Sequence, residues 1–557
     1  MISSNERYGS MHSVLGTLYA HAAASPARPA LLFVNRGQYR QFGYEDLRRE
    51  TERWAAFYVE GGLAPGAIVA IVLDHRYELY PAFLGAMRVG AVPTILPYPT
   101  SKQDPALYWN AQAELFERVR PACVVAHEAV LGRLAELTRG TDCRLVAVED
   151  GIGSPVAELA PLEAIERDDA IALLQHSSGT TGAKKGVALT FGAIRDQNAA
   201  HAVALPARPG DRVVSWLPLY HDMGLIAAFL FPLSAGACII ALDAFEWLLR
   251  PALFFELIEH YGANLAWLPN FAFNHLVRTH DPARTYDLSS MRAFVNCSEP
   301  CKTATFDAFA TTFEPSGVKP EMLRTCYAMA ETVFAVTLSE PGRPPKRLAV
   351  DAEALRVRSA AIAPAGDAAE FVSCGRPIDG IEARIDSSGA GNVGEIQLRG
   401  RFVFSEYHRN PQATSDSFEH GWYKTGDIGF MYAGELYLCG RRKELLIVHG
   451  QNFYATDVEA VVSEIDGVKP GRVAAFAVYD TIVGSEEAVV LAESEFEDED
   501  RRRDLSRRIR SDVYSRLGLQ VRTIEVRSVG ELVKTTSGKM SREENLRRFA
   551  SAGQPGS

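Results

Sequence analysis

Residues 171–187 read IALLQHSSGTTGAKKGV, a short apolar run followed at once by a loop of hydroxyls, glycines and lysines. The apolar run is typical of a buried strand. The glycines permit backbone conformations in which successive amide hydrogens point into one concavity, and such a concavity binds anions. Because Lys184 and Lys185 add positive charge, the stretch predicts a polyphosphate site where a buried strand ends.

Two other interpretations of the loop explain less of it. A P-loop requires GxxxxGK followed by Ser or Thr, whereas here Gly186 follows the lysines and no hydroxyl stands where a P-loop holds magnesium. A flexible surface loop accounts for the glycines and the hydroxyls, but not for lysines placed directly after a strand. Phosphate binding accounts for all three kinds of residue.

Similar apolar runs recur on both sides of this strand, with segments of helical length between them. They lie at 67–73, 122–126, 212–217, 237–242, 264–269 and 292–297. Continuous apolar strands joined by helices are typical of a sheet that is covered on both faces. We therefore expect an α/β fold in which a large N-terminal domain, residues 1–440, contains doubly wound sheets.

The pattern of the sequence changes twice in its second half. From about 371 to 440 it alternates strands with tight turns, as in IEARIDSSGAGNVGEIQLRG (381–400), which predicts a small β subdomain. Residues 441–557 have the pattern of a small C-terminal α/β domain whose first helix covers 457–465. Thr456 and Glu459 have the spacing of a capping box at the start of that helix.

Composition argues against several classes of protein. The net charge of -11 disfavours a nucleic-acid partner, because such a partner needs a broad basic surface. The cysteines form no CxxC pair or zinc-type group, which predicts reduced core thiols. The N-terminus has no apolar secretory signal, so we expect a cytoplasmic protein. Pro232 and Gly236 interrupt the charge-free stretch 224–242, which favours a buried helix followed by a buried strand over a membrane span.

Further motifs follow the loop along the chain. They are WLPLYHDMGLI (216–226), CYAMAET (326–332), GWYKTGD (421–427), GRRKELLIVHGQNFYATDVE (440–459) and KTTSGK (534–539). In this order and spacing they resemble the adenylate-forming superfamily of acyl- and aryl-acid ligases, over nearly the whole chain. The superfamily's large domain and small mobile C-terminal domain are therefore what the resemblance implies for the fold.

Within that superfamily the chain is most similar to the fatty acyl-AMP ligases. The likeness rests on LPLYHDMGLI, PNFAF (269–273), NCSEP (296–300), VSCGRP (372–377) and LAVDAEALRV (348–357). The last of these resembles the insertion that marks those ligases, and we place the insertion at about 345–371. The loop SSGTTGAKKG and Ala328 depart from the usual residues of the group, which implies a divergent branch.

The resemblance implies that three residues act on the reacting groups, with ATP and Mg²⁺ as cofactors. Lys539 is expected to contact the α-phosphate and the attacking carboxylate together. His221 is expected to lie beside that carboxylate as a positioning group, because a carboxylate nucleophile needs no deprotonation. Glu331 is expected to hold the Mg²⁺ that neutralises the phosphates.

The resemblance also implies a larger set of residues that hold the nucleotide. Asp427 and Arg441 are expected to face the ribose, Tyr327 to stack on adenine, Lys185 to hold the β- and γ-phosphates, and Lys443 to act as the hinge of the small domain. The full set is Ser177, Ser178, Gly179, Thr180, Thr181, Lys185, Ser298, Glu299, Pro300, Tyr327, Thr332, Asp427, Arg441 and Lys443.

The reaction implied is ATP-dependent conversion of a carboxylic acid, of the fatty-acid kind, to an acyl adenylate. The acyl group then passes to the phosphopantetheine thiol of an acyl carrier protein, an acceptor favoured by the insertion and by Ile447, where coenzyme A ligases often have lysine. An acyl-coenzyme A ligase and a nucleotide-binding protein without catalysis are the alternatives. Aromatic residues at 229, 231, 271 and 273 fit either an acyl pocket or plain core.

Overall fold

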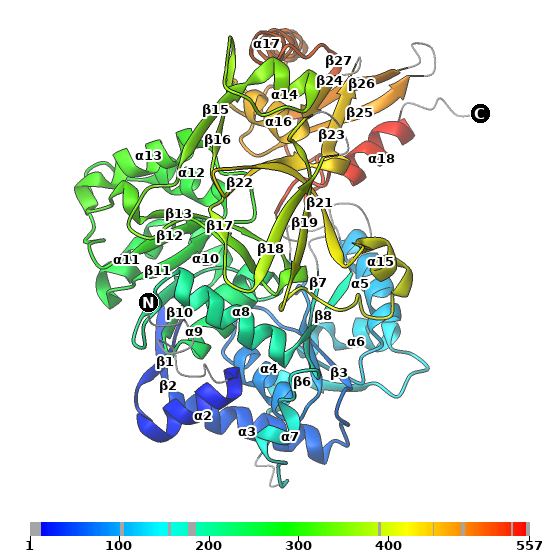
Figure 1. The fold of residues 1–557 in the computed structure, drawn as a ribbon. Helices are drawn as coiled ribbons and strands as arrows, with labels where there is room; N and C mark the ends of the chain where they lie inside the picture. The colour runs from blue at the N-terminus through cyan, green and yellow to red at the C-terminus, as the bar shows by residue number, and fades with distance from the viewer. Residues whose placement is uncertain are drawn as a thin grey trace.

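The computed structural model describes residues 13–100, 105–153, 157–176, 185–387, 391–448, 451–480, 485–535 and 538–552. The blue N-terminal elements lie at the bottom of the view in Figure 1, and the orange and red C-terminal elements lie at the top. Strands and helices alternate through the first 340 residues. The fold is therefore α/β, as the sequence predicts.

A nine-stranded sheet is the largest element of the fold. Its strand order is β17-β14-β13-β12-β11-β9-β10-β1-β2, with parallel pairing from β1 through β13 and antiparallel pairing at both edges. The strands are β1 (Pro29–Asn35), β2 (Gln38–Gly43), β9 (Arg212–Ser215), β10 (Cys238–Leu242), β11 (Leu265–Leu268), β12 (Ala293–Asn296), β13 (Leu323–Ala328), β14 (Ala335–Leu338) and β17 (Arg376–Pro377).

Both faces of this sheet are covered. Leu31 and Phe33 of β1 belong to one buried cluster, while Leu32 and Val34 belong to another, because successive side chains of a strand point to opposite faces. This double coverage explains why the strands read as unbroken apolar runs. The helices around the N-terminal sheets are α2 (Val14–Ala24), α3 (Tyr44–Glu60), α4 (Leu79–Arg88), α5 (Pro105–Val119), α6 (Glu128–Leu137), α7 (Leu162–Ile165), α8 (Phe191–Ala204), α9 (Phe231–Ser234), α10 (Ala244–Leu249), α11 (Ala252–Tyr261), α12 (Asn270–Thr279) and α13 (Thr303–Phe313).

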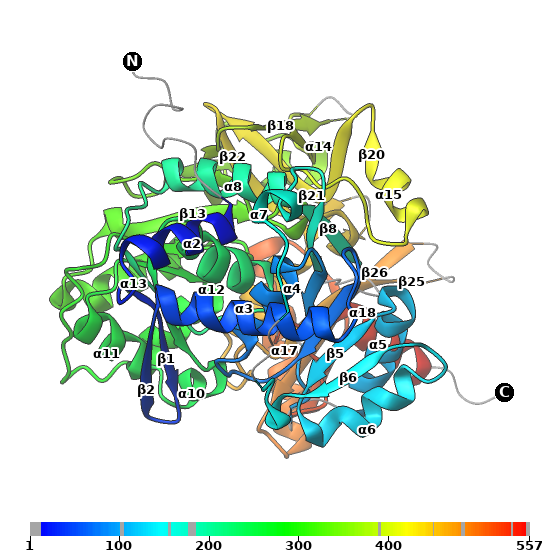
Figure 2. The same ribbon diagram turned by 90° about the horizontal axis from the view of Figure 1, so that it is seen from below.

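Two smaller sheets accompany the large one. A parallel sheet has the order β4-β3-β5-β6, and α5 and α6 lie beside it (Figure 2). The hairpin β7–β8 flanks the glycine-rich loop, with His176 paired to Gly186. The strands are β3 (Ile68–Val72), β4 (Val92–Ile95), β5 (Cys123–Ala126), β6 (Arg144–Ala147), β7 (Ile171–His176) and β8 (Gly186–Thr190). Each apolar run predicted as a strand is a strand.

The charge-free stretch 224–242 is buried within the protein. It forms a π-helix over Met223–Leu230, the short helix α9 and the buried strand β10. The prediction of a helix followed by a strand is therefore confirmed. Among the residues that the structure describes, no helix combines the length and the apolar character needed to cross a bilayer.

An antiparallel sheet and a hairpin follow the nine-stranded sheet along the chain. The sheet contains β18 (Ile381–Asp386), β19 (Gly394–Gly400), β20 (Phe418–Glu419), β21 (Trp422–Tyr432) and β22 (Glu435–Arg441), with α15 (Pro411–Ser417) before β20. The expected insertion folds as β15 (Arg347–Asp351), α14 (Ala352–Arg358) and β16 (Ala368–Val372). Val350 and Leu355 of this hairpin pack with Phe430 and Tyr437 of the antiparallel sheet.

The C-terminal segment, residues 445–552, has its own sheet and its own buried clusters. It contains β23 (Leu445–Val448), β24 (Gln451–Tyr454), α16 (Ala455–Ser463), β25 (Val473–Asp480), β26 (Ser485–Ser494), α17 (Glu499–Leu517), β27 (Val521–Ser528) and α18 (Arg542–Ala552). The division of the chain into domains at residue 440 stays a prediction.

The predicted capping box of α16 is wrong. The helix begins at Ala455, and its N-cap residue, Tyr454, makes no capping bond with its side chain. Glu459 is used elsewhere: its carboxylate accepts hydrogen bonds from Arg542 at 2.6 and 2.8 Å and from the amide of Ala475 at 3.0 Å. A buried ion pair to α18 therefore replaces the local bond that the sequence spacing suggested.

Candidate active site

The C-terminal segment reaches the N-terminal sheets through Lys539. Its ammonium donates a hydrogen bond to the carbonyl oxygen of Ser298 at 2.9 Å. Ser298 follows β12 with φ 71°, the left-handed region that a residue with a side chain seldom adopts. The structure therefore brings together KTTSGK and NCSEP, which are 241 residues apart in the chain.

Asp427 presents a buried carboxylate beside these residues. It lies in β21 directly opposite Arg441 of β22, so the register of the two strands sets the pair. Arg441 Nε lies 3.1 Å from Oδ1 of Asp427, and the hydroxyl of Tyr327 donates to Oδ2 at 2.6 Å. Burial raises the pKa of Asp427, whereas the charge of Arg441 and the Tyr327 hydroxyl act in the opposite direction.

Glu331 is the second carboxylate of the site, and it is half-buried. It lies in a short 3₁₀-helix, Ala330–Thr332, and its Oε1 accepts a hydrogen bond from the Tyr407 hydroxyl at 2.9 Å. Burial raises the pKa of Glu331, and the nearby charge of Asp222 adds to that shift while Arg441 opposes it. The Lys185 ammonium lies over the Tyr407 ring, 4.4 Å from its centroid. Tyr407 therefore links the predicted metal ligand to the predicted phosphate ligand.

The backbone after Glu331 is strained. Val333 has φ 63° and ψ −56°, and the amide of Phe334 donates to the carbonyl of Thr332 at 2.6 Å, which is a γ-turn of the rare positive-φ type. A β-branched residue in this region costs about 1–3 kcal/mol. The Thr332 hydroxyl is buried and donates to the carbonyls of Met329 and Phe334 at 3.2 and 3.0 Å. Its role as a nucleotide ligand stays a prediction.

His221 and Asp222 lie where the π-helix begins. The Gln175 amide donates to the carbonyl of Tyr220 at 3.2 Å, which ties this segment to β7. Asp222 accepts a hydrogen bond from the amide of Met223 at 2.8 Å, and burial raises the pKa of its carboxyl while the charge of Lys539 opposes that shift. The chain therefore places His221 one residue from a carboxyl that interacts electrostatically with Lys539.

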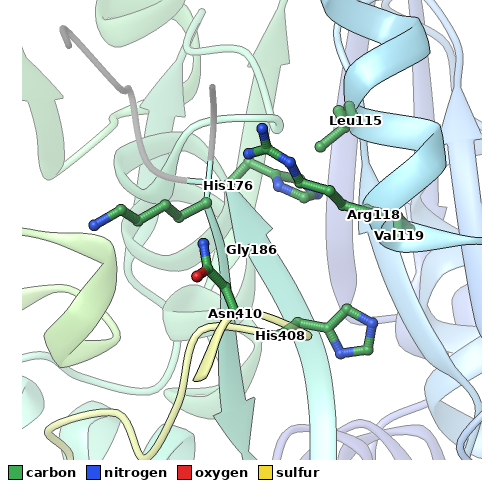
Figure 3. Close-up of a pocket in the computed structure, with 8 residues that line it drawn as sticks. Leu115, Arg118, Val119, His176, Gly186, His408 and Asn410 are labelled. Atoms are coloured by element: carbon green, nitrogen blue, oxygen red, sulfur yellow. The ribbon is translucent and has the colours of Figure 1, made fainter. Parts of the chain in front are cut away.

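The glycine-rich loop lies largely outside the described residues. Ser177, Ser178, Gly179, Thr180, Thr181 and Lys184 are among the loop residues that lie outside the described ones. Lys185 is described, and burial lowers the pKa of its ammonium, with the charge of Glu331 opposing and that of Lys443 reinforcing the shift. Near the ends of β7 and β8, His176 and Gly186 line a small hollow together with Arg118 of α5 (Figure 3). Basic side chains, those of Arg118 and Lys185, therefore lie near the ends of β7 and β8.

Glu299 and Pro300 lie on the same segment as Ser298. The Glu299 carboxylate accepts a hydrogen bond from the amide of Phe271 at 3.0 Å, which joins this segment to the start of α12. Burial lowers the pKa of Lys534 to about 8, with Glu299 among the charges that act against this shift. Lys443 is exposed in a short 3₁₀-helix, Arg442–Glu444, that follows β22.

The residues present fit ATP and Mg²⁺. Two carboxyls whose pKa values burial raises, those of Glu331 and Asp222, suit a hard cation with oxygen ligands. The described part of the chain holds no group of three or more metal-ligating side chains that could bind an ion alone.

Sequence reasoning missed Asp222 and Tyr407. Asp222 stands inside the quoted LPLYHDMGLI motif, so its position beside His221 was an available signal. Tyr407 lies in a loop that pairs with β8 through a bridge to Val187, and nothing in its local sequence marks it. Only the fold brings its hydroxyl to Glu331.

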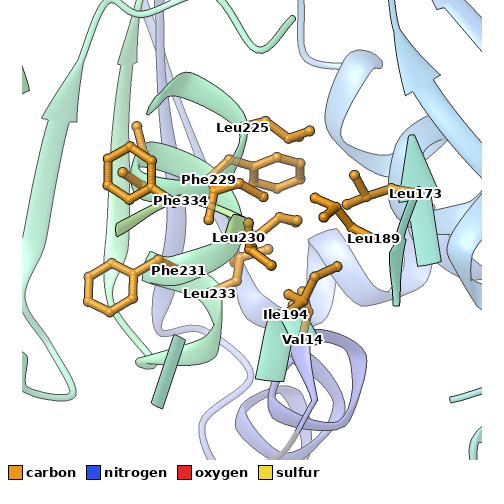
Figure 4. Close-up of a cluster of buried hydrophobic side chains, with 14 of the residues drawn as sticks. Val14, Leu173, Leu189, Ile194, Leu225, Phe229, Leu230, Phe231, Leu233 and Phe334 are labelled. Carbon is orange, nitrogen blue, oxygen red and sulfur yellow. The ribbon is translucent and has the colours of Figure 1, made fainter. Parts of the chain in front are cut away.

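The aromatic residues considered for an acyl pocket are mostly core. Phe229 and Phe231 lie among buried leucines, including Leu225 and Leu233 (Figure 4). Phe273 is fully buried as well. Phe271 differs, because 42% of it is exposed and its ring lies at the side of Trp247. Core packing is therefore the better interpretation for the first three.

Comparisons with known proteins agree with this site. The AMP-binding enzyme family matches residues 18–408. The "Putative ligase Rv1013" of Mycobacterium tuberculosis is 30% identical, over 88% of this chain and 92% of that protein. The "Long-chain-fatty-acid--AMP ligase FadD26" of Mycobacterium marinum is 30% identical, over 90% and 92%. The "4-hydroxyphenylalkanoate adenylyltransferase" of Mycobacterium tuberculosis is 29% identical, over 98% and 93%.

A solved structure has the same fold from end to end. A chain described under fatty acyl-adenylate ligases from E. coli and L. pneumophila superimposes with a TM-score of 0.88 at 25% identity, covering 97% of this chain and 98% of that one. A second chain, the fatty acid AMP ligase from Legionella pneumophila, gives a TM-score of 0.72 at 26% identity over 98% and 96%.

Proposed function

Because this chain belongs to the AMP-binding enzyme family, we propose that it activates a carboxylic acid with ATP, forming an acyl adenylate and releasing pyrophosphate. The observation that carries the proposal is the hydrogen bond of Lys539 to the segment that follows β12, together with Asp222, whose carboxyl interacts electrostatically with both Lys539 and Arg441, the partner of Asp427. Lys539 and Ser298 are 241 residues apart in the chain, so the fold brings these groups together.

The reaction joins two anions. A carboxylate oxygen attacks the α-phosphorus of ATP, a new P–O bond forms, and the bond to the β-phosphate oxygen breaks to release pyrophosphate. Positive charge must lie where negative charge gathers, and a group already in position is most effective. Lys539 is proposed to be that group, because its ammonium lies at the segment that follows β12, where it donates to the Ser298 carbonyl at 2.9 Å.

The nucleotide is held by the buried carboxylate of Asp427 and its ion-pair partner Arg441, whose side chain is 46% exposed. The Asp427 carboxylate binds the ribose hydroxyls, with Arg441 and Tyr327 fixing its orientation. Ser298, Glu299, Pro300 and Thr332 line the nucleotide from the other side. Lys185 and the loop before it hold the terminal phosphates, and Glu331 holds Mg²⁺, which when bound neutralises their charge.

His221 positions the acid. A carboxylate nucleophile has no proton to lose, so a histidine beside it orients and does not act as a base. The hydrogen bond from the Gln175 amide to the carbonyl of Tyr220 fixes the backbone of this segment. Lys443 is the hinge about which the C-terminal segment turns after adenylation.

The acid is proposed to be a fatty or aryl-alkanoic acid. The relatives carry names for long-chain fatty acids and for 4-hydroxyphenylalkanoates, both of which combine a carboxylate with an extended apolar body. The chain's own aromatic residues give no chain length, since Phe229 and Phe231 are core. A series of acids tested by adenylate formation identifies the substrate.

The acceptor is proposed to be the phosphopantetheine thiol of an acyl carrier protein. The insertion contacts the C-terminal segment: Asn452 donates to the hydroxyl of Ser359 at 3.4 Å, and Tyr454 packs on the cluster that contains Leu355. Contacts of this kind change which orientation of the segment is populated, and coenzyme A depends on a surface built in one orientation. Ile447, 49% exposed, offers no charge to a nucleotide phosphate.

The test incubates the enzyme with ATP, an activated acid and one acceptor at a time. We expect acylation of a holo carrier protein, little acyl-coenzyme A, and no product with the apo carrier, which lacks the thiol. Efficient turnover with coenzyme A alone would assign the protein to the acyl-coenzyme A ligases. Absence of adenylate with every acid, despite ATP binding, would leave a nucleotide-binding protein.

A further inference from the structure

Two adjoining hollows lie near the ends of β7 and β8, the strands on either side of the glycine-rich loop. The inner one is lined by Leu115, Arg118, Val119, His176, Lys185, Gly186, His408 and Asn410. The outer one is a shallow hollow of about 530 Å³ lined by Glu117, Arg118, Arg120 and Arg409. Arg118 belongs to both, and Figure 3 shows it reaching from α5 towards His176 and Gly186. Arg118 thus lines both the hollow that contains the proposed phosphate ligand Lys185 and the hollow at the surface.

Backbone hydrogen bonds fix the positions of these arginines. The amide of His408 donates to the carbonyl of Gly186 at 2.7 Å, and the amide of Ala188 donates to the carbonyl of Glu406 at 3.1 Å, so the segment that carries Arg409 pairs with β8. On the opposite side Arg120 directly follows α5, and its amide donates to the carbonyl of Phe116 at 2.8 Å. Buried residues of α5 hold that helix end in the core.

The outer hollow is basic on an otherwise acidic protein. It has three guanidinium groups and one carboxylate, Glu117, whereas the whole chain carries a net charge of -11. Within the described parts of the chain, Arg118, Arg120 and Arg409 form no ion pair. The charge of Arg409 also lowers the pKa of His408, after burial, while Glu406 opposes it. The outer hollow therefore carries a net positive charge, with one carboxylate, Glu117, among three guanidinium groups.

A basic helix end has one simpler explanation. Arginines at a helix C-terminus offset the negative end of the helix dipole, which accounts for Arg118 and Arg120 on α5. It does not account for Arg409, which comes from a different segment some 290 residues later and lines the same hollow. Three guanidiniums from two segments are what a multivalent phosphate anion binds.

We propose that Arg118, Arg120 and Arg409 form a second anion site that binds inorganic pyrophosphate as it leaves or enters the phosphate loop. The inference rests on the proposed function, since adenylation makes this product. Pyrophosphate carries three to four negative charges and must leave a site designed to hold it. The inner hollow, of about 10 Å³, has room for about one water molecule, so pyrophosphate binds in the outer hollow, where the three guanidiniums concentrate it near Lys185.

The test measures pyrophosphate binding by calorimetry without acid or turnover. In a Lys185→Ala background, which weakens the loop, we expect residual binding that depends on the arginines. Adding R118Q and R409Q should raise the Kd of pyrophosphate about tenfold or more at low ionic strength, and the difference should shrink in 0.5 M salt. The matched control is R133Q on α6, because Arg133 is exposed and already paired with Glu136 at 2.9 Å.

Enzyme kinetics separate this proposal from its rivals. In acid-dependent ATP–pyrophosphate exchange, R118Q/R409Q should raise the KM for pyrophosphate at least fivefold and the KM for ATP less, because ATP keeps its ribose contacts. An unchanged KM and Kd for pyrophosphate would overturn the site. If only the KM for the carrier protein rises, the arginines form a docking face for that protein and the proposal is wrong. Pyrophosphate binding without any acid-dependent exchange would count against the proposed function alone.

Discussion

The residues proposed to bind the nucleotide and the residue proposed to catalyse are held in opposite ways. Asp427 is buried, Glu331 is half-buried, and each is fixed by side chains from other strands or loops. Lys539, by contrast, comes from the C-terminal segment, and its ammonium donates a hydrogen bond to the backbone carbonyl of Ser298. The binding groups are pre-organised by the sheets, whereas the catalytic group arrives with the C-terminal segment.

Polar contacts around the C-terminal segment reinforce this difference. Lys302 pairs with Asp457 at 2.7 Å, with the side chains 43% and 37% exposed. Exposed pairs of this kind contribute about 0–1 kcal/mol each. Contacts this weak can break and reform at each turnover, as the proposed rotation of this segment after adenylation requires. The affinity for ATP and the rate of adenylation should therefore respond to different mutations.

The largest effect should come from Lys539→Ala. The ammonium acts on charge that develops in the transition state, so we expect adenylate formation to fall about 100- to 1,000-fold while the Kd of ATP changes less than threefold. Lys469→Ala is the matched control, because Lys469 is an exposed lysine of the same segment paired with Glu495. Near-normal adenylation by the Lys539 variant would remove this residue from catalysis.

Asp427→Ala should act on binding. Loss of two charge-assisted hydrogen bonds to the ribose should weaken ATP binding about 10- to 100-fold, measured as Kd and as KM. Asp379→Ala is the control, since Asp379 is exposed and pairs with Arg401 at 3.0 Å on the protein surface. An unchanged ATP affinity would show that the ribose lies elsewhere.

Lys302→Ala tests the weak contacts. We expect adenylation to change no more than threefold, because one exposed ion pair is lost. A double-mutant cycle with Asp457→Asn should give a coupling energy of about 1 kcal/mol or less. A coupling several times larger would mean that the C-terminal segment is held firmly, and the contrast between the two regions would fail.

His127→Gln should change stability and leave activity alone. His127 lies between Asp74 and Glu149, and its hydrogen bond to Asp74 is the main cause of its raised pKa. A raised pKa stabilises the fold fully below about pH 6.5, and the contribution disappears as pH rises through the folded-state pKa. The variant should lose about 1 kcal/mol at pH 6 and less at pH 9, by thermal or denaturant unfolding. An equal loss at both pH values would contradict this.

Sequence reasoning predicted the strands well because each is buried on both faces and therefore reads as an apolar run. It predicted Lys539, Asp427 and Glu331 through motifs that resemble those of the adenylate-forming superfamily. In the structure, electrostatic contacts with Asp222 and Arg441 connect these three residues, and their roles stay predictions. The capping box of α16 failed for a tertiary reason: Arg542 comes from α18, and no local pattern announces a partner 83 residues away.

Tyr407 shows the other limit of sequence reasoning. Its hydroxyl orients Glu331 and its ring supports Lys185, yet both contacts exist only because the segment around it pairs with β8. The spacing of residues in the sequence indicates the local structure of a helix or strand. It does not report which loops the fold brings side by side.

The central claim is that the chain makes an acyl adenylate, and acid-dependent ATP–pyrophosphate exchange tests it most directly. A series of fatty and aryl-alkanoic acids is added one at a time to the wild-type protein and to Lys539→Ala, with labelled pyrophosphate and Mg²⁺. The account predicts exchange that requires an acid, differs among the acids, and nearly disappears in the variant. Exchange that needs no acid, or none with any acid although ATP binds, would contradict the claim.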